Sequence, residues 1–319
     1  MAGAAMRSRP LGRGGPQVSE VGIGCNNFGA RIDADAARAV VDAALDHGVT
    51  LFDTADIYGG GESERFLGRA LRGRRDRVLI ATKFGMAMPG TDPAQARGAP
   101  LYIRAAVEAS LRRLDVEVID LYQIHCPDPQ TPIAETLATL HELVAAGTVR
   151  FIGCSNFFPW QIADAQWIAR SAALTGFVAA QDEYSLLRRD AEAERLPALD
   201  HFGLGLLPYF PLAHGLLTGK YRRGIPPPAG TRLGRRPGGG GLLTPDAFDR
   251  VEGLERFAAA RDLSMLQVAI GSLLSRPVVS SVIAGATSPE QVAANADALT
   301  WRPTAQDWAE LDGITAPPA

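Results

Sequence analysis

The regular alternation of short apolar runs with Ala-rich amphipathic segments constrains the fold of this chain more than any other feature. The eight runs that predict strands are Val21–Cys25, Leu51–Asp53, Val78–Thr82, Asp120–Ile124, Arg150–Cys154, Val178–Gln181, Gly205–Tyr209 and Ser280–Ala284. Alternation of this kind is typical of repeated βα units that share a parallel sheet. Since eight such strands can close into a ring, the predicted fold class is α/β, a (β/α)₈ TIM barrel.

Helical periodicity fills the intervals between these runs. Apolar residues recur there at spacings of three and four, as Val40, Ala43 and Ala44 do. The predicted helices are Asp35–His47, Gly61–Leu71, Tyr102–Leu114, Pro132–Ala146, Pro159–Ala172, Glu192–His201, Pro245–Arg261, Ser264–Leu274 and Ser288–Leu299. An open doubly wound sheet would also alternate strands and helices, but it usually carries G-x-G-x-x-G after its first strand, and this sequence has no such motif there. A length of 319 residues suits one barrel domain spanning residues 1–319.

Composition narrows the possible partners. With 46% hydrophobic residues, 21% charged residues and a net charge of −3, the chain resembles a globular protein with no overall attraction to nucleic acid. Its three cysteines are widely spaced, which predicts neither a disulfide framework nor a metal site and favours the cytoplasm. We expect no signal peptide, because residues 1–15 lack an apolar core, and no membrane span. The sequence makes no prediction of oligomeric state.

The longest irregular segment, Leu212–Thr244, contains three consecutive prolines and four consecutive glycines. It follows the seventh predicted strand, where barrels commonly build a phosphate site. A loop of this length in a compact domain usually serves function.

Polar residues at the ends of the predicted strands are the candidates for chemistry, because barrel active sites lie at the carboxyl ends of the strands. Asp53 ends the second strand and Tyr58 follows it, Lys83 comes directly after the third, and His125 directly after the fourth. An isolated residue of this kind commonly does no more than end an element. Four at consecutive strand ends meet at one rim of a closed barrel, which favours a shared site.

This set suits the reduction of a carbonyl group. Hydride addition leaves an alkoxide that needs a proton, and the Tyr58 phenol can supply it if its pKa falls from about 10 toward the working pH. The Lys83 ammonium would lower that pKa, Asp53 would keep the ammonium charged, and His125 would orient the substrate oxygen.

Several segments resemble motifs of the aldo-keto reductase family, closest in wording to its bacterial and potassium-channel-β-subunit-like branch. The segments are Phe52-Asp53-Thr54-Ala55-Asp56-Ile57-Tyr58-Gly59, Ile80-Ala81-Thr82-Lys83-Phe84-Gly85, Asp120-Leu121-Tyr122-Gln123-Ile124-His125, Gly147–Phe157, Gln181–Leu187, Pro211–Tyr221 and Gly285–Gln291. They occur in one order over about residues 8–300, which is far more specific than any single match.

The resemblance implies a catalytic tetrad of Asp53, Tyr58, Lys83 and His125, a hairpin near Arg7–Ser19 that closes the barrel floor, and an NADP(H) cofactor held without a Rossmann fold. In the nicotinamide part of the cofactor site it implies Ser155, Asn156 and Gln181 as hydrogen-bonding residues and Tyr209 as a stacking residue. The remaining cofactor-binding residues that it implies are Gly24, Cys25, Asp53, Phe210, Pro211, Leu212, Gly215, Lys220, Gly285, Thr287, Ser288, Gln291 and Asn295.

One departure from the family pattern concerns the choice between NADP(H) and NAD(H). A Lys or Arg near the last cofactor motif commonly pairs with the 2′-phosphate, but this chain has Gly285, Thr287 and Gln291 there. Thr287 and Ser288 can still bind a phosphate at a helix N-terminus, so NADP(H) remains the prediction and NAD(H) the alternative.

Substrate residues are the least constrained part of the sequence. Phe28, Ile57, Phe84 and Trp160 are candidates for lining the pocket, and ordinary packing explains them equally well. The predicted function is reduction of an aldehyde or ketone, a small carbonyl substrate, to an alcohol. The alternative is a cofactor-binding, redox-sensing regulatory subunit with little turnover.

Overall fold

Eight parallel strands form a ring in the computed structural model, which describes residues 6–88, 92, 94–235 and 237–316. The strands are β3 (Val21–Gly24), β4 (Leu51–Asp53), β5 (Leu79–Phe84), β6 (Ile119–Ile124), β7 (Val149–Ser155), β8 (Ala179–Glu183), β9 (Gly205–Tyr209) and β10 (Val282–Gly285). From β3 to β9 each strand pairs with the next along the chain, and β10 pairs with β3. A bridge between Leu206 and Val279 connects β9 to the segment before β10, so the predicted (β/α)₈ barrel is confirmed.

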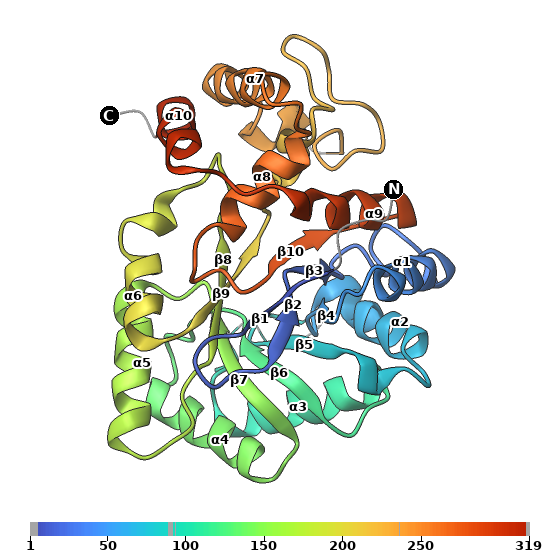
Figure 1. The fold of residues 1–319 in the computed structure, drawn as a ribbon. Helices are drawn as coiled ribbons and strands as arrows, with labels where there is room; N and C mark the ends of the chain where they lie inside the picture. The colour runs from blue at the N-terminus through green and yellow to red at the C-terminus, as the bar shows by residue number, and fades with distance from the viewer. Residues whose placement is uncertain (1–5, 89–91, 93, 236, 317–319) are drawn as a thin grey trace.

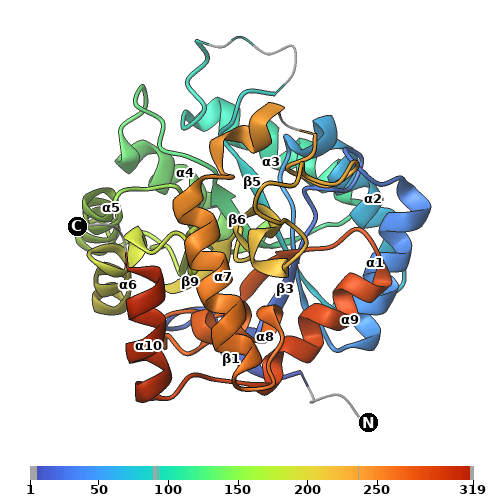
Figure 2. The same cartoon turned by 90° about the horizontal axis from the view of Figure 1, so that it is seen from above.

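Helices surround the ring (Figure 1). They are α1 (Ala34–Asp46), α2 (Glu62–Ala70), α3 (Pro100–Leu114), α4 (Ile133–Ala145), α5 (Pro159–Ser171), α6 (Arg195–Phe202), α7 (Pro245–Ala259), α8 (Met265–Leu274), α9 (Pro289–Asp297) and α10 (Ala305–Thr315). Nine of these were predicted to within a few residues, whereas α10 was not. Figure 2 shows α7 and α10 lying side by side on the outer side of the barrel.

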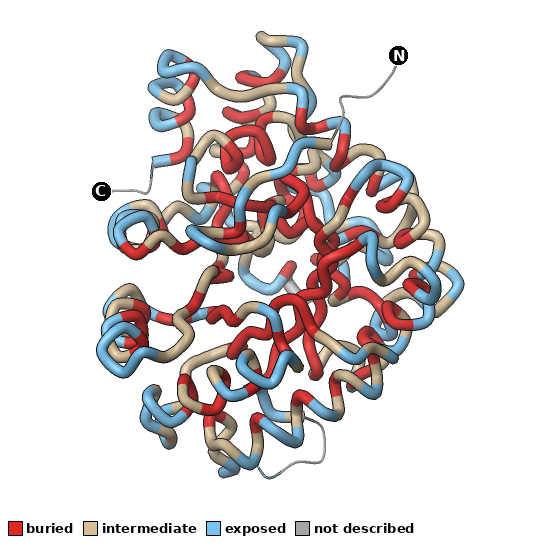
Figure 3. The backbone as a smooth tube through the Cα atoms, turned by 60° about the horizontal axis from the view of Figure 1, so that its bottom comes forward, coloured by how far each residue is buried: buried red, intermediate tan, exposed pale blue. Residues whose placement is uncertain are grey.

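Packing in two layers explains why these segments fold in this way. Buried apolar side chains from α1 to α6 and from the outer faces of the strands form one continuous core between helices and sheet. Figure 3 shows the strands as the most deeply buried part of the chain, with exposure confined largely to the outer helix faces. Because the helices are apolar on one face only, burying that face against the sheet orients each of them.

The inside of the barrel is filled from its amino-terminal end. Strands β1 (Ser8–Pro10) and β2 (Gln17–Ser19) form the predicted hairpin, pairing antiparallel from Ser8 with Ser19 to Pro10 with Gln17. Leu11 and Val18 of this hairpin are fully buried against Leu51, Leu121 and other inward-facing strand residues. The floor is therefore closed, and only the carboxyl end of the barrel is left for a site.

The long segment after β9 contains the short 3₁₀ helices η4 (Ala213–Thr218) and η5 (Pro237–Gly241). Leu216, Leu217, Tyr221 and Leu233 pack in a second apolar cluster with α7 and α8. This packing holds the segment against the carboxyl end of the barrel. Residues 89–91 and 93, and residue 236 of the predicted irregular segment, lie outside the described part of the chain. The assignment of residues 1–319 to one domain stays a prediction.

Candidate active site

The four strand-end residues predicted to act together do meet at the carboxyl end of the barrel. Asp53 is the last residue of β4, Lys83 lies near the end of β5, and His125 follows β6 directly. Tyr58 begins the short 3₁₀ helix η1 (Tyr58–Gly61), whose glycines 59 to 61 all have a positive φ and turn the chain back into α2. Asp53, Tyr58 and His125 line one cavity, and Lys83 is buried behind them.

Lys83 is fully buried and has three acceptors for its ammonium group. Its Nζ donates to Asp53 Oδ1 at 2.9 Å, to Asp53 Oδ2 at 2.8 Å and to the carbonyl oxygen of Thr54 at 2.8 Å. Burial by itself lowers the pKa of Lys83, but the charge of Asp53 and the neighbouring Tyr58 offset this and raise the pKa above its usual value. The residue is therefore a permanently charged cation at neutral pH.

Tyr58 lies next to this cation. The Nζ of Lys83 is 5.1 Å from the centre of the Tyr58 ring. Burial raises the pKa of the Tyr58 hydroxyl, and the charge of Lys83 and its hydrogen bond to the phenol offset this only in part. Lys83 thus acts to lower the phenol pKa, as the sequence predicted, but desolvation exceeds this effect and the pKa stays above its usual value. Tyr58 keeps its proton at neutral pH.

His125 is neutral under the same conditions. Desolvation, with a smaller effect of the Lys83 charge, lowers the pKa of its imidazole to about 3. The ring packs edge to face with Tyr58 at a centroid distance of 5.9 Å. Its Nδ1 is buried and has no hydrogen-bond partner among the described residues. Since a buried N–H without an acceptor costs more than a bare ring nitrogen, this favours the tautomer with the proton on Nε2, a neutral donor.

A chain of hydrogen bonds connects the residues predicted for the nicotinamide end. Gln181 Nε2 donates to Asp53 Oδ1 at 2.8 Å, and Ser155 Oγ donates to the carbonyl oxygen of Gln181 at 2.8 Å. Asn156, with φ at +61°, donates to Ser155 Oγ and accepts from the Tyr209 hydroxyl at 2.8 Å. All four residues line the cavity, so the strand ends hold polar side chains in fixed positions around it.

Backbone strain marks the segment that follows β9. Phe210, Ala213 and His214 have φ values of 52°, 45° and 58°, in the left-handed region that non-glycine residues rarely adopt. Gly215 has a φ of 98°, a conformation that residues with a Cβ atom rarely adopt, which explains the glycine at this position. Strain of this kind persists where the surrounding structure enforces it, typically at ligand sites.

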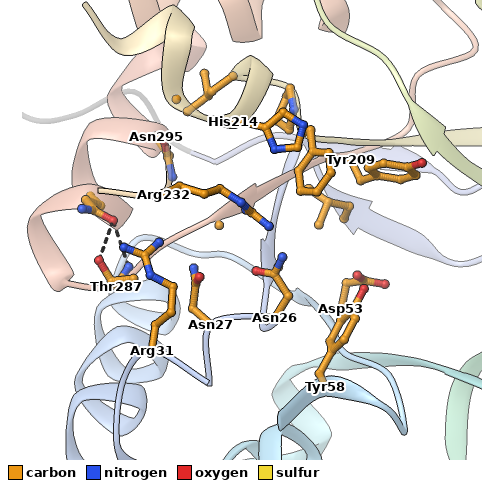
Figure 4. Close-up of a pocket in the computed structure, with 18 of the residues that line it drawn as sticks. Asn26, Asn27, Arg31, Asp53, Tyr58, Tyr209, His214, Arg232, Thr287 and Asn295 are labelled. Atoms are coloured by element: carbon orange, nitrogen blue, oxygen red, sulfur yellow. Dashed lines mark hydrogen bonds between the residues drawn. The ribbon is translucent and has the colours of Figure 1, made fainter. Parts of the chain in front are cut away.

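The cavity continues from the tetrad to α9 and encloses about 580 Å³. Gly24, Asp53, Ser155, Asn156, Gln181, Tyr209, Phe210, Pro211, Leu212, Gly215, Lys220, Gly285, Thr287, Gln291 and Asn295 are the predicted cofactor residues that line it. At its far end, Thr287 donates through its backbone N–H (2.9 Å) and its hydroxyl (3.2 Å) to Gln291 Oε1. Asn295 lies at the same end (Figure 4), and its Nδ2 is buried without a hydrogen-bond partner among the described residues.

Besides Lys83, six predicted site residues do not line the cavity. Cys25 and Phe28 are fully buried in the core, and Phe84 stacks on Tyr122 at 4.8 Å between sheet and helices. Ile57 and Ser288 adjoin lining residues without lining the cavity themselves. Trp160 is 65% exposed at the start of α5. Phe84 follows Lys83 on β5, and neighbouring residues of a strand face opposite sides of the sheet, which explains its outward position.

Ten lining residues were not predicted. They are Asn26, Asn27, Arg31, Met86, His214, Thr218, Arg232, Leu266, Ile283 and Ala294. Of these, Arg31 and Arg232 change the charge of the site most. Together with Lys220 they give three cationic side chains, against one lining carboxylate, Asp53, which Lys83 already neutralises. An excess of positive charge in a long cavity favours a ligand with several negative charges.

The described residues contain no group of three or more His, Cys, Asp or Glu side chains arranged to hold a metal ion. Within the same part of the chain, the longest and most apolar helices fall short of what a membrane span requires.

The fold and the site together define a class: a closed (β/α)₈ barrel whose carboxyl end carries a long cationic cavity leading to a Lys–Asp pair, a phenol and a neutral imidazole. The aldo/keto reductase family model matches residues 20–316. Uncharacterized oxidoreductase YrpG from Bacillus subtilis (strain 168) is 38% identical over 295 residues, which cover 88% of this chain and 87% of that protein. A probable voltage-gated potassium channel subunit beta from Oryza sativa subsp. japonica is 35% identical over 301 residues, which cover 92% and 91%.

A solved structure leads to the same class. The aldo-keto reductase AKR11C1 from Bacillus halodurans, in its holo form, superposes with a TM-score of 0.81 and 31% sequence identity, over 97% of this chain and 96% of that one. This chain belongs to the aldo/keto reductase family. Its membership implies an oxidoreductase that binds a nicotinamide cofactor and acts on small carbonyl substrates.

Proposed function

We propose that this protein reduces an aldehyde or ketone to an alcohol with NADPH, and that Tyr58 is the general acid. The observation that carries the proposal is the fully buried Lys83 ammonium, held by both oxygens of Asp53 beside the cavity-lining phenol. A buried cation in this position stabilises the negative charge that a phenol acquires as it gives up its proton.

Each residue of the tetrad then has one task. A reduced nicotinamide, when bound, supplies the hydride. The neutral His125 imidazole donates a hydrogen bond to the substrate oxygen and orients it. Tyr58 delivers its proton to that oxygen as negative charge develops there. Lys83 stabilises the resulting phenolate, and Asp53 maintains the charge and the position of Lys83.

The chain's own residues also fit the dinucleotide. Ser155, Asn156 and Gln181 present polar groups where a carboxamide would bind, and Tyr209 offers a ring for stacking. The strained segment from Phe210 to Gly215 would border the pyrophosphate together with Lys220. The buried Nδ2 of Asn295 has no acceptor among the described residues, and an adenine nitrogen or similar group would supply one.

Positive charge favours NADP(H) over NAD(H), because a 2′-phosphate adds up to two negative charges to the ligand. The three cationic lining residues exceed what a pyrophosphate alone would need. We expect fluorescence titration of the purified protein to give a lower Kd for NADPH than for NADH. A preference of about tenfold for NADH would contradict this part of the proposal.

The central test is a Tyr58→Phe variant, assayed with NADPH over aldehydes, ketosugars, pyridoxal and α-dicarbonyls. We expect kcat to fall by about two to four orders of magnitude, the usual contribution of general acid catalysis, with the Kd for NADPH unchanged. Tyr184→Phe is a matched control, because Tyr184 does not line the cavity and its hydroxyl donates to Glu192 Oε1 at 2.7 Å. Equal activity of Tyr58→Phe and wild type would refute the role of Tyr58.

The alternative of a regulatory subunit with little turnover shares the same pocket, so its test is the wild-type protein on the same panel. The absence of turnover over every carbonyl class would favour that alternative. We also propose a cytoplasmic location, which the three unpaired cysteines of the described chain support.

A further inference from the structure

The segment that commonly carries the 2′-phosphate clamp has no basic residue in this chain. From Gly285 to Asn295 the sequence contains neither Lys nor Arg, and Thr287 is the lining residue there that offers a hydroxyl. If the cavity accepts NADP(H), the positive charge for its additional phosphate must come from another part of the barrel. This inference rests on the proposed function and identifies the residue that supplies that charge.

Arg31 reaches the same end of the cavity from the loop after β3. The loop is a compact turn in which the backbone N–H groups of Arg31 and Ile32 both donate to the carbonyl oxygen of Asn27, at 2.8 and 3.1 Å. Asn27 Nδ2 in turn donates to the carbonyl oxygen of Ala286 at 3.4 Å, which fastens the turn to the loop after β10. Figure 4 places Arg31 and Thr287 at the same end of the cavity, which both residues line.

Among the described residues, no carboxylate forms an ion pair with Arg31. Its Nη2 donates to the carbonyl oxygen of Gly230 at 3.1 Å, and its Nε is buried with no hydrogen-bond partner among the described residues. Burial and the nearby Arg235 lower the pKa of Arg31 from its usual value. A half-buried guanidinium that faces another arginine and no carboxylate is destabilised unless an anion binds, so its environment matches a phosphate site.

Arg232 lies in a different part of the cavity. Its guanidinium stacks over the Phe210 ring at 4.5 Å, and Phe210 adjoins Tyr209 and His214. This is the middle of the cavity, where NADPH and NADH have the same chemical groups. The two arginines therefore have separable consequences for the two cofactors.

We propose that Arg31, together with the Thr287 hydroxyl, binds the 2′-phosphate of NADP(H) and determines the cofactor preference of this protein. A planar guanidinium can engage two phosphate oxygens at once, and its free Nε supplies one of the donors. The backbone N–H and the hydroxyl of Thr287 can bind the phosphate once the Gln291 side chain, which accepts from both, moves away.

The experiment measures Kd for NADPH and for NADH by fluorescence with wild type and three single variants of the full chain. Arg31→Gln should raise the Kd for NADPH by about tenfold or more, which corresponds to the loss of one charge-assisted hydrogen bond. The Kd for NADH should change by less than about twofold. Arg232→Gln should weaken both cofactors alike. Arg38→Gln removes a 71% exposed charge of α1 outside the cavity and should change neither Kd.

A second measurement removes the nicotinamide from the comparison. Adenosine 2′,5′-bisphosphate and ADP are each titrated calorimetrically into protein without added cofactor. Arg31→Gln should bind the first probe more weakly than wild type does and should bind ADP equally well. Arg31→Lys keeps the positive charge but loses the planar guanidinium that can bind two phosphate oxygens. Its Kd for NADPH should lie between those of wild type and Arg31→Gln. Thermal unfolding of each variant establishes that it is folded before the titrations are compared.

The outcomes separate this inference from the proposed function. Equal weakening of NADPH and NADH by Arg31→Gln, or no weakening of either, would overturn the role of Arg31 while carbonyl reduction by wild type still stands. Failure of wild type to bind either cofactor would instead refute the proposed function itself.

Discussion

Asp53 has two electrostatic roles at the base of the cavity. Both of its oxygens accept from Lys83, and Oδ1 also accepts from Gln181, so one carboxylate holds the ammonium and a residue of the nicotinamide end in a fixed relation. Because the side chains of Asp53 and Lys83 are 4% and 0% exposed, water screens their interaction weakly. Removal of the carboxylate would leave a buried cation without a partner, so the Asp53 side chain is needed for the charge of Lys83 as well as for its position.

The pKa shifts of the site predict how carbonyl reduction depends on pH. His125 has a pKa of about 3 and Tyr58 a pKa above its usual 10, so neither group changes its protonation between about pH 5 and pH 8. We expect kcat/KM for reduction to be nearly constant over that range, as measured from initial rates in buffers of equal ionic strength. Alcohol oxidation, which needs the phenolate, should still be increasing with pH at the alkaline end.

A contrary result would be easy to recognise. An ionisation between about pH 5 and pH 8 that disappears in His125→Asn would mean that the imidazole is charged in part of that range. His141→Asn is the control, because that histidine lies on α4 outside the cavity and bonds the Thr175 hydroxyl.

At the scale of single residues, the strand-end residues could be predicted because their position depends on one property, the place where an apolar run ends. Arg31 could not be predicted in this way. It lies in a loop, and only the closure of the barrel between β10 and β3 brings that loop next to Thr287. Phe84 could have been placed correctly, since Lys83 faces the inside of the barrel and alternation then turns Phe84 outward.

At the scale of secondary structure, α10 shows what periodicity alone does not reveal. Its sequence, Ala305–Thr315, is short and contains a glycine, and the packing of Trp308, Leu311 and Ile314 in the second apolar cluster stabilises it. Two guanidinium groups lie near the Trp308 ring, with Arg276 at 3.9 Å and Arg189 at 5.3 Å from its centre. The capping box of Thr304 and Asp307 was a local signal for the helix start that the sequence already contained.

This packing predicts a stability effect for Trp308→Ala. Trp308 Nε1 donates to Ser275 Oγ at 3.0 Å, so the substitution removes a hydrogen bond, two cation–π contacts and the burial of a large ring. We expect the free energy of unfolding in urea to fall by about 2–3 kcal/mol, below the range for a fully buried Trp because this side chain is partly exposed. Trp160→Ala, at a 65% exposed position, should change it by less than about 0.5 kcal/mol. Equal losses in the two variants would show that α10 is not held by Trp308.

Strand and helix positions in the barrel itself were predictable for a different reason. Leu51–Asp53 and Gly205–Tyr209 have the predicted bounds, and both are apolar runs closed by a polar or turn residue. Strand β7 extends one residue beyond the predicted Arg150–Cys154 at each end, because ladder pairing with β6 and β8 continues past the apolar run. The ends of such a strand depend on its pairing with neighbouring strands, which the local sequence pattern does not predict.

At the scale of the whole molecule, ion pairs join the amino-terminal hairpin to a segment late in the chain. Glu20, between β2 and β3, accepts from Arg7 at 3.2 Å, from Arg9 at 2.8 Å and from Arg302 at 2.7 Å. One carboxylate with a 3% exposed side chain thus connects the amino-terminal hairpin to the segment between α9 and α10. Because this end of the barrel is closed by packing and by ion pairs, its disruption should affect stability and leave the cavity at the other end intact.

The charge state of Glu20 makes this a pH-dependent contribution. Burial raises the pKa of Glu20, but Arg302 and Arg9 more than offset it, so the pKa in the folded protein lies below the ordinary value of 4.5. A carboxyl group of this kind stabilises the fold above that value, and the contribution is lost as the pH falls through the folded-state pKa. Glu20→Gln should therefore lower the free energy of unfolding by about 2–3 kcal/mol at pH 7, less than for a fully buried pair since the arginines are partly exposed.

Urea unfolding of both proteins between pH 7 and pH 3 measures this contribution. The difference between wild type and Glu20→Gln should be constant down to about pH 5 and then shrink, because wild type loses the charge that the variant never had. Glu108→Gln is the matched control: it removes a carboxylate whose side chain is 67% exposed and lies 3.7 Å from Arg112, and it should cost less than about 0.5 kcal/mol at every pH. A difference for Glu20→Gln that stays constant to pH 3 would mean that packing around this side chain, and not its charge, holds the amino-terminal hairpin to the segment between α9 and α10.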